Sequence, residues 1–94
     1  MFDKMKALMD MQKKMQEIKR QLDQTDFEVK SQDGTVTVVM NGSQQVKDII
    51  VAEGAAKDAL QKALKDTFNR AIKRSQEVAA QKMKEITGLN LPGL

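Results

Sequence analysis

The longest helical pattern in this chain is KDALQKALKDTFNRAIKRSQEVAAQKMKEI, residues 57–86, a run without glycine or proline. Its apolar side chains recur three or four residues apart and fall on one broad stripe when the helix turns 100° per residue. They are Leu60, Leu64, Phe68, Ala71, Ile72, Val78, Ala79, Met83 and Ile86. Such a helix is about 45 Å long, which is more than a compact monomer of 94 residues can cover. The stripe therefore predicts a partner, and a second copy of the chain is the simplest one.

A first helix is predicted over residues 1–23. Its apolar residues alternate three and four apart, as in the seam of a coiled coil: Leu8, Met11, Met15, Ile18 and Leu22. Methionine is flexible, so this short seam specifies a partner and a register only weakly. Methionine at this spacing is ordinarily part of a core, and a special docking surface is the rarer alternative.

Residues 26–52 alternate apolar and polar side chains, as strands with one buried face do. The clearest strand, residues 35–40, lies between two turn signals, Asp33-Gly34 and Asn41-Gly42; both positions of the second tolerate positive φ. The third segment, residues 45–52, alternates poorly, which leaves a bulge or burial on both faces open. The expected fold class is α+β: an N-terminal helix, a three-stranded antiparallel meander and a long C-terminal helix over residues 56–87.

The end of the chain carries two helix-stopping signals. Gly88 stands where a C-terminal cap is expected, and Pro92 cannot continue a helix. The tail, residues 88–94, either docks on the fold or frays. Since no linker or internal repeat is present, residues 1–94 are expected to form a single domain.

The composition argues against catalysis. The chain has no cysteine and no histidine, which excludes disulfides and thiolate metal sites and removes the commonest general base. Ser31, Ser43 and Ser75 have no histidine to activate them. We expect no enzyme, cofactor, metal site or small-molecule substrate. No apolar run approaches the length of a membrane span, and the N-terminus does not resemble a signal peptide, so a cytoplasmic protein is expected.

Charge is distributed unevenly along the chain. The net charge is only +3, but residues 1–23 carry six basic and four acidic side chains, and residues 54–94 carry eight and four. Residues 24–53 carry two basic and five acidic side chains. An anionic partner is therefore expected to meet the outer segments.

Four motifs, in this order, resemble the YbaB/EbfC family of small bacterial nucleoid-associated proteins. They are Met-Gln-x-Lys-Met-Gln at residues 11–16, Val-x-Val-x-x-Asn-Gly at 36–42, Phe-Asn-x-Ala at 68–71 and Leu-Pro-Gly-Leu at 91–94. The resemblance implies a homodimer whose sheets meet at the centre and whose helices project as a pair of tweezers. It also implies binding of double-stranded DNA with limited sequence preference, in the nucleoid. It carries no catalytic residue and no cofactor.

The candidate DNA contacts are basic side chains on the exposed faces of the two helices. They are Lys13, Lys14, Lys19 and Arg20 in the first helix, and Lys62, Arg70, Lys73, Arg74 and Lys84 in the second. Arg70, Lys73 and Arg74 form the densest cluster. No helix-turn-helix, zinc finger or aromatic platform is present, so phosphate contact and DNA shape are expected rather than base readout.

Three alternatives stay open. Pairs such as Lys62–Asp66 and Lys73–Glu77 could make an ordinary solvated, salt-bridged helix face, which charge alone favours. The chain could instead be a protein-interaction or scaffold module that docks through the methionine-lined first helix and the tail. An amphipathic helix on an anionic membrane is weaker, because the first helix lacks aromatic residues and a strong basic excess.

Overall fold

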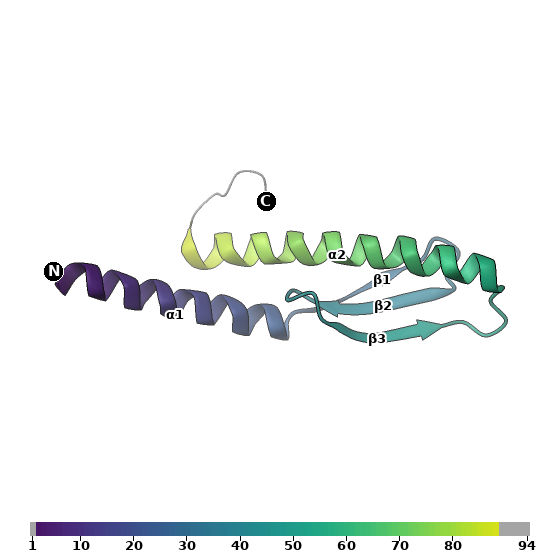
Figure 1. Cartoon of the computed structure of the whole chain (residues 1–94), viewed down its shortest axis with the longest axis horizontal. Helices are drawn as coiled ribbons and strands as arrows, with labels where there is room; N and C mark the ends of the chain where they lie inside the picture. Colours follow the sequence, from purple (N-terminus) through teal and green to yellow (C-terminus); the bar gives the residue numbers. More distant parts are fainter. Residues whose placement is uncertain (1, 89–94) are drawn as a thin grey trace.

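The computed structural model describes residues 2–88, which form two helices and one sheet (Figure 1). In chain order these are α1 (Phe2–Gln24), β1 (Asp26–Lys30), β2 (Val36–Asn41), β3 (Val46–Val51) and α2 (Lys57–Thr87). The predicted succession of helix, meander and long helix is confirmed. Gly88 caps α2 with φ of 71°, and its N–H donates to the Lys84 carbonyl over 2.8 Å. The rest of the tail lies outside the described residues.

The sheet is antiparallel with the strand order β1-β2-β3. Its register is irregular between Val39 and Met40, so the bulge suspected from the poor alternation of the third strand is present. Burial of β3 on both faces, the other possibility, is wrong for this single chain, because all six β3 residues are exposed.

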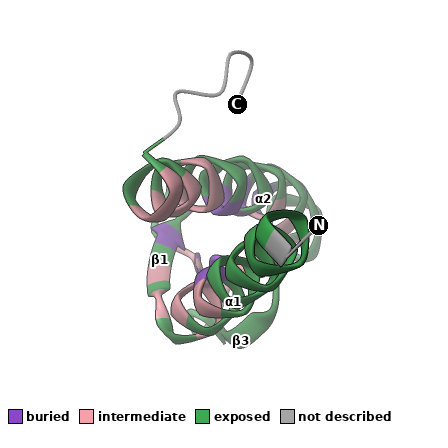
Figure 2. Ribbon diagram, turned by 90° about the vertical axis from the view of Figure 1, so that its left-hand side faces the viewer, coloured by how far each residue is buried: buried purple, intermediate pink, exposed green. Residues whose placement is uncertain are grey.

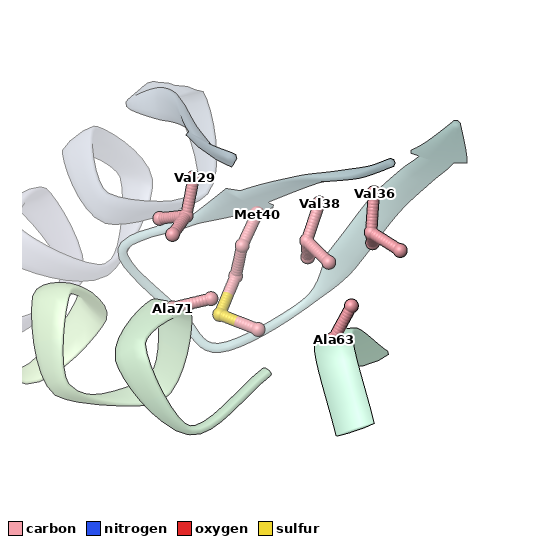
Figure 3. Packing of buried hydrophobic residues seen from close by; sticks show 6 residues of the cluster. All are labelled: Val29, Val36, Val38, Met40, Ala63 and Ala71. Carbon is pink, nitrogen blue, oxygen red and sulfur yellow. The ribbon is translucent and has the colours of Figure 1, made fainter. Parts of the chain in front are cut away.

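The core lies between α2 and one face of the sheet. Figure 3 shows the valines and the methionine of β1 and β2 pointing toward two alanines of α2. The six residues are Val29, Val36, Val38, Met40, Ala63 and Ala71. Figure 2 shows that buried residues are few and that β3 lies outside the covered region.

The buried face of α2 is made of small residues, of which the predicted apolar stripe includes only Ala71. Ala63, Thr67, Ala71 and Ser75 are the buried residues of this helix. Small side chains let the helix lie close to the sheet, so the larger residues of the predicted stripe stand beside the contact line. Leu64 and Phe68 are only half-buried, and Ile72 is 39% exposed.

The loop between β2 and β3 joins both helices to the sheet. The hairpin occurs where Asn41-Gly42 predicts it, but the left-handed residue is Gln44, with φ of 61°. Gly42 serves close packing instead: a Cβ there would lie 2.8 Å from Leu22 Cδ2 of α1 and 3.1 Å from Val78 Cγ1 of α2. Its N–H donates to the Leu22 and Thr25 carbonyls.

α1 extends well beyond the sheet, so the molecule is elongated, with extents of 64 × 24 × 16 Å (Figure 1). Near its C-terminal end, Ile18 is buried and Leu22 is half-buried. Toward the N-terminus the same side of the helix loses its cover, and Leu8 and Met11 are more than 60% exposed. α1 is thus anchored at one end only.

Candidate nucleic-acid interface

The four candidate residues of α1 are all exposed, but they differ in their partners. Among the described residues, Lys13 and Lys14 form no ion pair or hydrogen bond. Lys19 Nζ lies 3.2 Å from Asp23 Oδ2, and Arg20 forms a two-pronged ion pair with Glu17. Lys13 and Lys14 are therefore free to meet an anion, whereas Lys19 and Arg20 are engaged on their own helix.

The pKa of Glu17 reflects its contact with Arg20. The Arg20 guanidinium, and after it the side-chain amide of Gln21, holds the pKa of Glu17 at about 2. Arg20 also donates from Nη1 to Gln24 Oε1 over 3.0 Å. This arginine is consequently shared between two side chains, one turn before it and one turn after it.

The outward face of α2 carries a row of lysines. Lys62, Lys73 and Lys84 are exposed and make no ion pair within residues 2–88. Lys65 is also exposed and has no ion pair within these residues. It was not among the predicted DNA contacts, although it lies three residues from Lys62 and therefore on a neighbouring part of the helix surface. At 100° per residue, Lys65 and Lys73 point away from the nearest buried residues of α2. Lys62 stands about 100° from Ala63 and lines, with it, the cleft described below.

Arg70 and Arg74 lie instead on the flank of α2 that faces β1. Arg70 Nη2 donates to the Lys30 carbonyl over 2.6 Å. The guanidinium carbon of Arg74 lies 5.5 Å from the centre of the Phe27 ring. The cluster expected from Arg70, Lys73 and Arg74 is thus divided between two faces: both arginines, although exposed, contact the sheet, while Lys73 points to solvent.

The described residues do not form the ion pairs that the salt-bridged alternative for α2 predicted. Within the described part of the chain, neither Lys62–Asp66 nor Lys73–Glu77 is an ion pair, and the one pair on this helix joins Lys82 to Glu85. The outward lysines are solvated rather than neutralised by contact. Asp66 and Glu77 still reduce the positive field around them.

A cleft of about 540 Å³ lies between the β1–β2 turn and α2. Lys62 and Arg70 line it together with Asp33 and Asp66, so its charges balance. The hydroxyls of Thr35 and then Ser31 hold the pKa of Asp33 at about 2, which keeps this carboxylate ionised. An electrically balanced cleft does not favour a phosphate group over water.

Two other kinds of feature are absent from residues 2–88. No group of three or more acidic side chains there could hold a metal ion. Neither α1 nor α2 has an apolar stretch long enough to cross a bilayer.

The sequence has clear relatives among known proteins. Residues 1–90 match the model of the YbaB/EbfC DNA-binding family. A nucleoid-associated protein of Gloeothece citriformis is 34% identical, with 99% of this chain and 82% of that protein covered. One from Clostridium novyi is 32% identical, with 96% and 83% covered.

The fold has a counterpart among solved structures. The crystal structure of an uncharacterized protein from Helicobacter pylori matches with a TM-score of 0.74 and 26% identity, covering 82% of this chain and 86% of that one. The fold of this chain therefore also occurs in a solved structure. With its sequence matched over residues 1–90, this chain belongs to the YbaB/EbfC DNA-binding family.

Proposed function

We propose that this protein is a bacterial nucleoid-associated protein that binds double-stranded DNA as a homodimer. It contacts mainly phosphates, has low sequence specificity, and affects nucleoid organisation or gene expression in the cytoplasm. Membership of a DNA-binding family and the nucleoid-associated relatives support this proposal. No catalytic role is proposed.

The observation that carries the proposal is the set of unpaired lysines on the two helices. Duplex DNA is a dense line of phosphates, and each phosphate that a cation neutralises releases condensed counterions. Cations that are exposed, and not already neutralised by a carboxylate contact, are the groups this requires. Within residues 2–88 they include Lys13, Lys14, Lys62, Lys73 and Lys84.

An uncovered apolar surface supports the homodimer. Residues directly opposite each other on paired strands share a face of the sheet. Ile49 lies opposite Val38, and Val51 lies opposite Val36. Both β3 residues therefore lie on the face of the sheet that α2 covers at β1 and β2. α2 does not reach them: they remain 43% and 44% exposed. Apolar surface continuous with a core is what a second copy would bury.

Double-stranded DNA binding is tested by fluorescence anisotropy with a labelled duplex of mixed sequence, about three helical turns long. We expect binding at low salt, with the logarithm of the association constant falling linearly as the logarithm of salt concentration rises. An unrelated duplex of equal length is expected to bind with similar affinity. Absence of binding to either duplex at low salt, by protein shown to be dimeric, contradicts the proposal.

One observation favours a second candidate function, a protein-interaction module. The part of α1 that precedes Ile18 carries Met5, Leu8, Met11 and Met15, each more than half exposed. Affinity capture from a lysate with and without nuclease separates the two functions. Partners that are lost on nuclease treatment favour DNA, and partners that persist favour the interaction module.

A further inference from the structure

All three arginines of this chain have partners within it. Arg20 bonds Glu17 and Gln24 on α1, Arg70 bonds the Lys30 carbonyl, and Arg74 lies over Phe27. The lysines Lys62, Lys65 and Lys73 have no such partner in the described residues. On α2, both arginines therefore contact the sheet, whereas within residues 2–88 these three lysines make no contact of that kind.

The contact of Arg70 closes part of a free sheet edge. The Lys30 carbonyl and the Ser31 N–H belong to one trans peptide, so they point in opposite directions. The Ser31 N–H donates to Val36 at the start of β2, and the Lys30 carbonyl therefore points outward from β1, where no strand follows. Arg70 supplies the missing donor from α2.

The contact of Arg74 lies one helical turn further along α2. Its guanidinium is within the distance at which a cation is attracted to the face of an aromatic ring. Phe27 belongs to β1 and packs against the hydrophobic core. Arg70 and Arg74 together fasten the middle of α2 to the edge strand at two points.

The lysine ridge, defined as Lys62, Lys65 and Lys73, lies on the outward side of α2 next to these contacts, and its first member, Lys62, lines the same cleft as Arg70. Its members follow helical spacing with Asn69 between them, and they extend over about 16 Å of the helix. Any change in how α2 sits on β1 would move the whole ridge. The position of the ridge therefore depends on the two arginine contacts.

We propose that Arg70 and Arg74 are positioning residues that hold α2 on β1, and that the lysine ridge makes the phosphate contacts of this helix. This inference rests on the proposed DNA binding. The charge pattern predicted phosphate contacts by a cluster of Arg70, Lys73 and Arg74, whereas this inference assigns the phosphate contacts of α2 to lysines alone. It also adds Lys65 to the interface.

Three variants of the full chain test the assignment: K62Q/K65Q/K73Q, R70Q/R74Q, and R70K/R74K, which keeps both charges. Each is measured by urea unfolding and by anisotropy with the same duplex over a series of salt concentrations. For the lysine variant we expect an unchanged urea midpoint and a shallower salt dependence. The slope should fall by about 0.9 for each phosphate that the variant no longer neutralises.

For the arginine variants we expect the opposite pattern. The urea midpoint falls, and in buffer where the protein is fully folded the affinity falls by a few-fold while the slope of the salt dependence is kept. R70K/R74K should share this weakening, because an ammonium group does not reproduce the planar, forked guanidinium. Weaker binding together with a lower urea midpoint, with both charges retained, indicates that the lysine ridge is displaced rather than that a phosphate contact is missing.

Two results overturn the assignment. In one, R70Q/R74Q lowers the slope at an unchanged urea midpoint while R70K/R74K behaves like the wild type, so that the arginines are the phosphate contacts. In the other, the lysine variant keeps the wild-type slope. If the wild type binds no duplex, both the proposed function and the phosphate-binding role of the lysine ridge are wrong. The urea midpoints then still show whether Arg70 and Arg74 hold α2 on β1.

Discussion

Ser75 is the residue through which α2 holds the β2–β3 loop. Its hydroxyl donates to the Asn41 carbonyl over 3.0 Å and accepts from the Gln44 N–H over 3.1 Å. Asn41 in turn donates to the Asp23 carbonyl at the end of α1. One buried hydroxyl thus closes a chain of hydrogen bonds that joins both helices to the sheet.

Replacing Ser75 with alanine is expected to cost about 0.5–1.5 kcal/mol of unfolding free energy, because both hydrogen bonds of its hydroxyl are lost. The Gln44 N–H keeps its own bond to the Asn41 carbonyl over 3.2 Å, so neither backbone group is left unpaired. Urea unfolding measures this. Thr67→Val is the matched control on the same buried face: the Thr67 hydroxyl has no hydrogen-bond partner among the described residues, so its removal should leave stability unchanged or raise it. Equal stability of Ser75→Ala and the wild type would contradict the role given to this hydroxyl.

Asp33 makes the β1–β2 turn sensitive to acid. Hydrogen bonds from Thr35 and Ser31 lower its folded pKa to about 2 from an ordinary value of 3.8. A depressed folded pKa stabilises the fold fully above the ordinary value, and this stabilisation is lost as pH falls toward 2. Asp33→Asn should therefore unfold at lower urea than the wild type at pH 7.

The gap between the Asp33→Asn and wild-type urea midpoints should close as pH falls from about 4 to about 2. Asp10→Asn, at an exposed position of α1, serves as the control and should match the wild type at pH 7. A gap for Asp33→Asn that stays constant down to pH 2 would show that the carboxylate charge is not what stabilises the turn.

At the scale of elements, periodicity predicts the helices and strands well but misplaces the contact line of α2. The predicted stripe follows larger apolar residues such as Leu64, Phe68 and Ile72 and shares only Ala71 with the buried line. The rest of that line is alanine, threonine and serine. Distance to the sheet decides which residues are buried, and a single sequence does not record that distance. The contacts of Arg70 and Arg74 with the sheet were out of reach for a related reason, since periodicity places Arg70 next to Lys73 without showing that β1 lies beside it.

α1 offers a test of how far its anchoring extends. Ile18 is 4% exposed and Met11 is 63% exposed, although both follow the same predicted seam. Ile18→Ala is expected to cost about 2–4 kcal/mol of unfolding free energy through reduced burial and the cavity left behind. Met11→Ala should change it by less than about 0.5 kcal/mol. A comparable cost at Met11 would reveal that this half of α1 is covered in the assembled protein.

At the scale of the whole molecule, the elongated shape leaves apolar surface on β3 that no element among the described residues covers. Ile49 and Ile50 are neighbours on this strand, but they pair with Val38 and Thr37 and so face opposite sides of the sheet. Only the side of Ile49 is continuous with the core. The two positions give a matched pair for locating the contact between copies.

Ile49→Lys is expected to convert the proposed homodimer to monomers, because association would bury an unpaired ammonium group in apolar surface. Size-exclusion chromatography with light scattering measures the mass, and far-ultraviolet circular dichroism checks that the fold is kept. Ile50→Lys should remain dimeric. The reverse result, dissociation at Ile50 alone, would place the contact on the other side of the sheet.

Residues 41–45, which connect β2 to β3, hydrogen-bond to the end of α1 and to Ser75 of α2. The length of this connection therefore influences where both helices lie. We expect one residue added there to shift α1 and α2 together and to change the angle between them. The link around Gly54 is different: nothing lies within 4 Å of a Cβ placed there. We therefore expect a residue inserted in that link to leave the packing of both helices on the sheet unchanged.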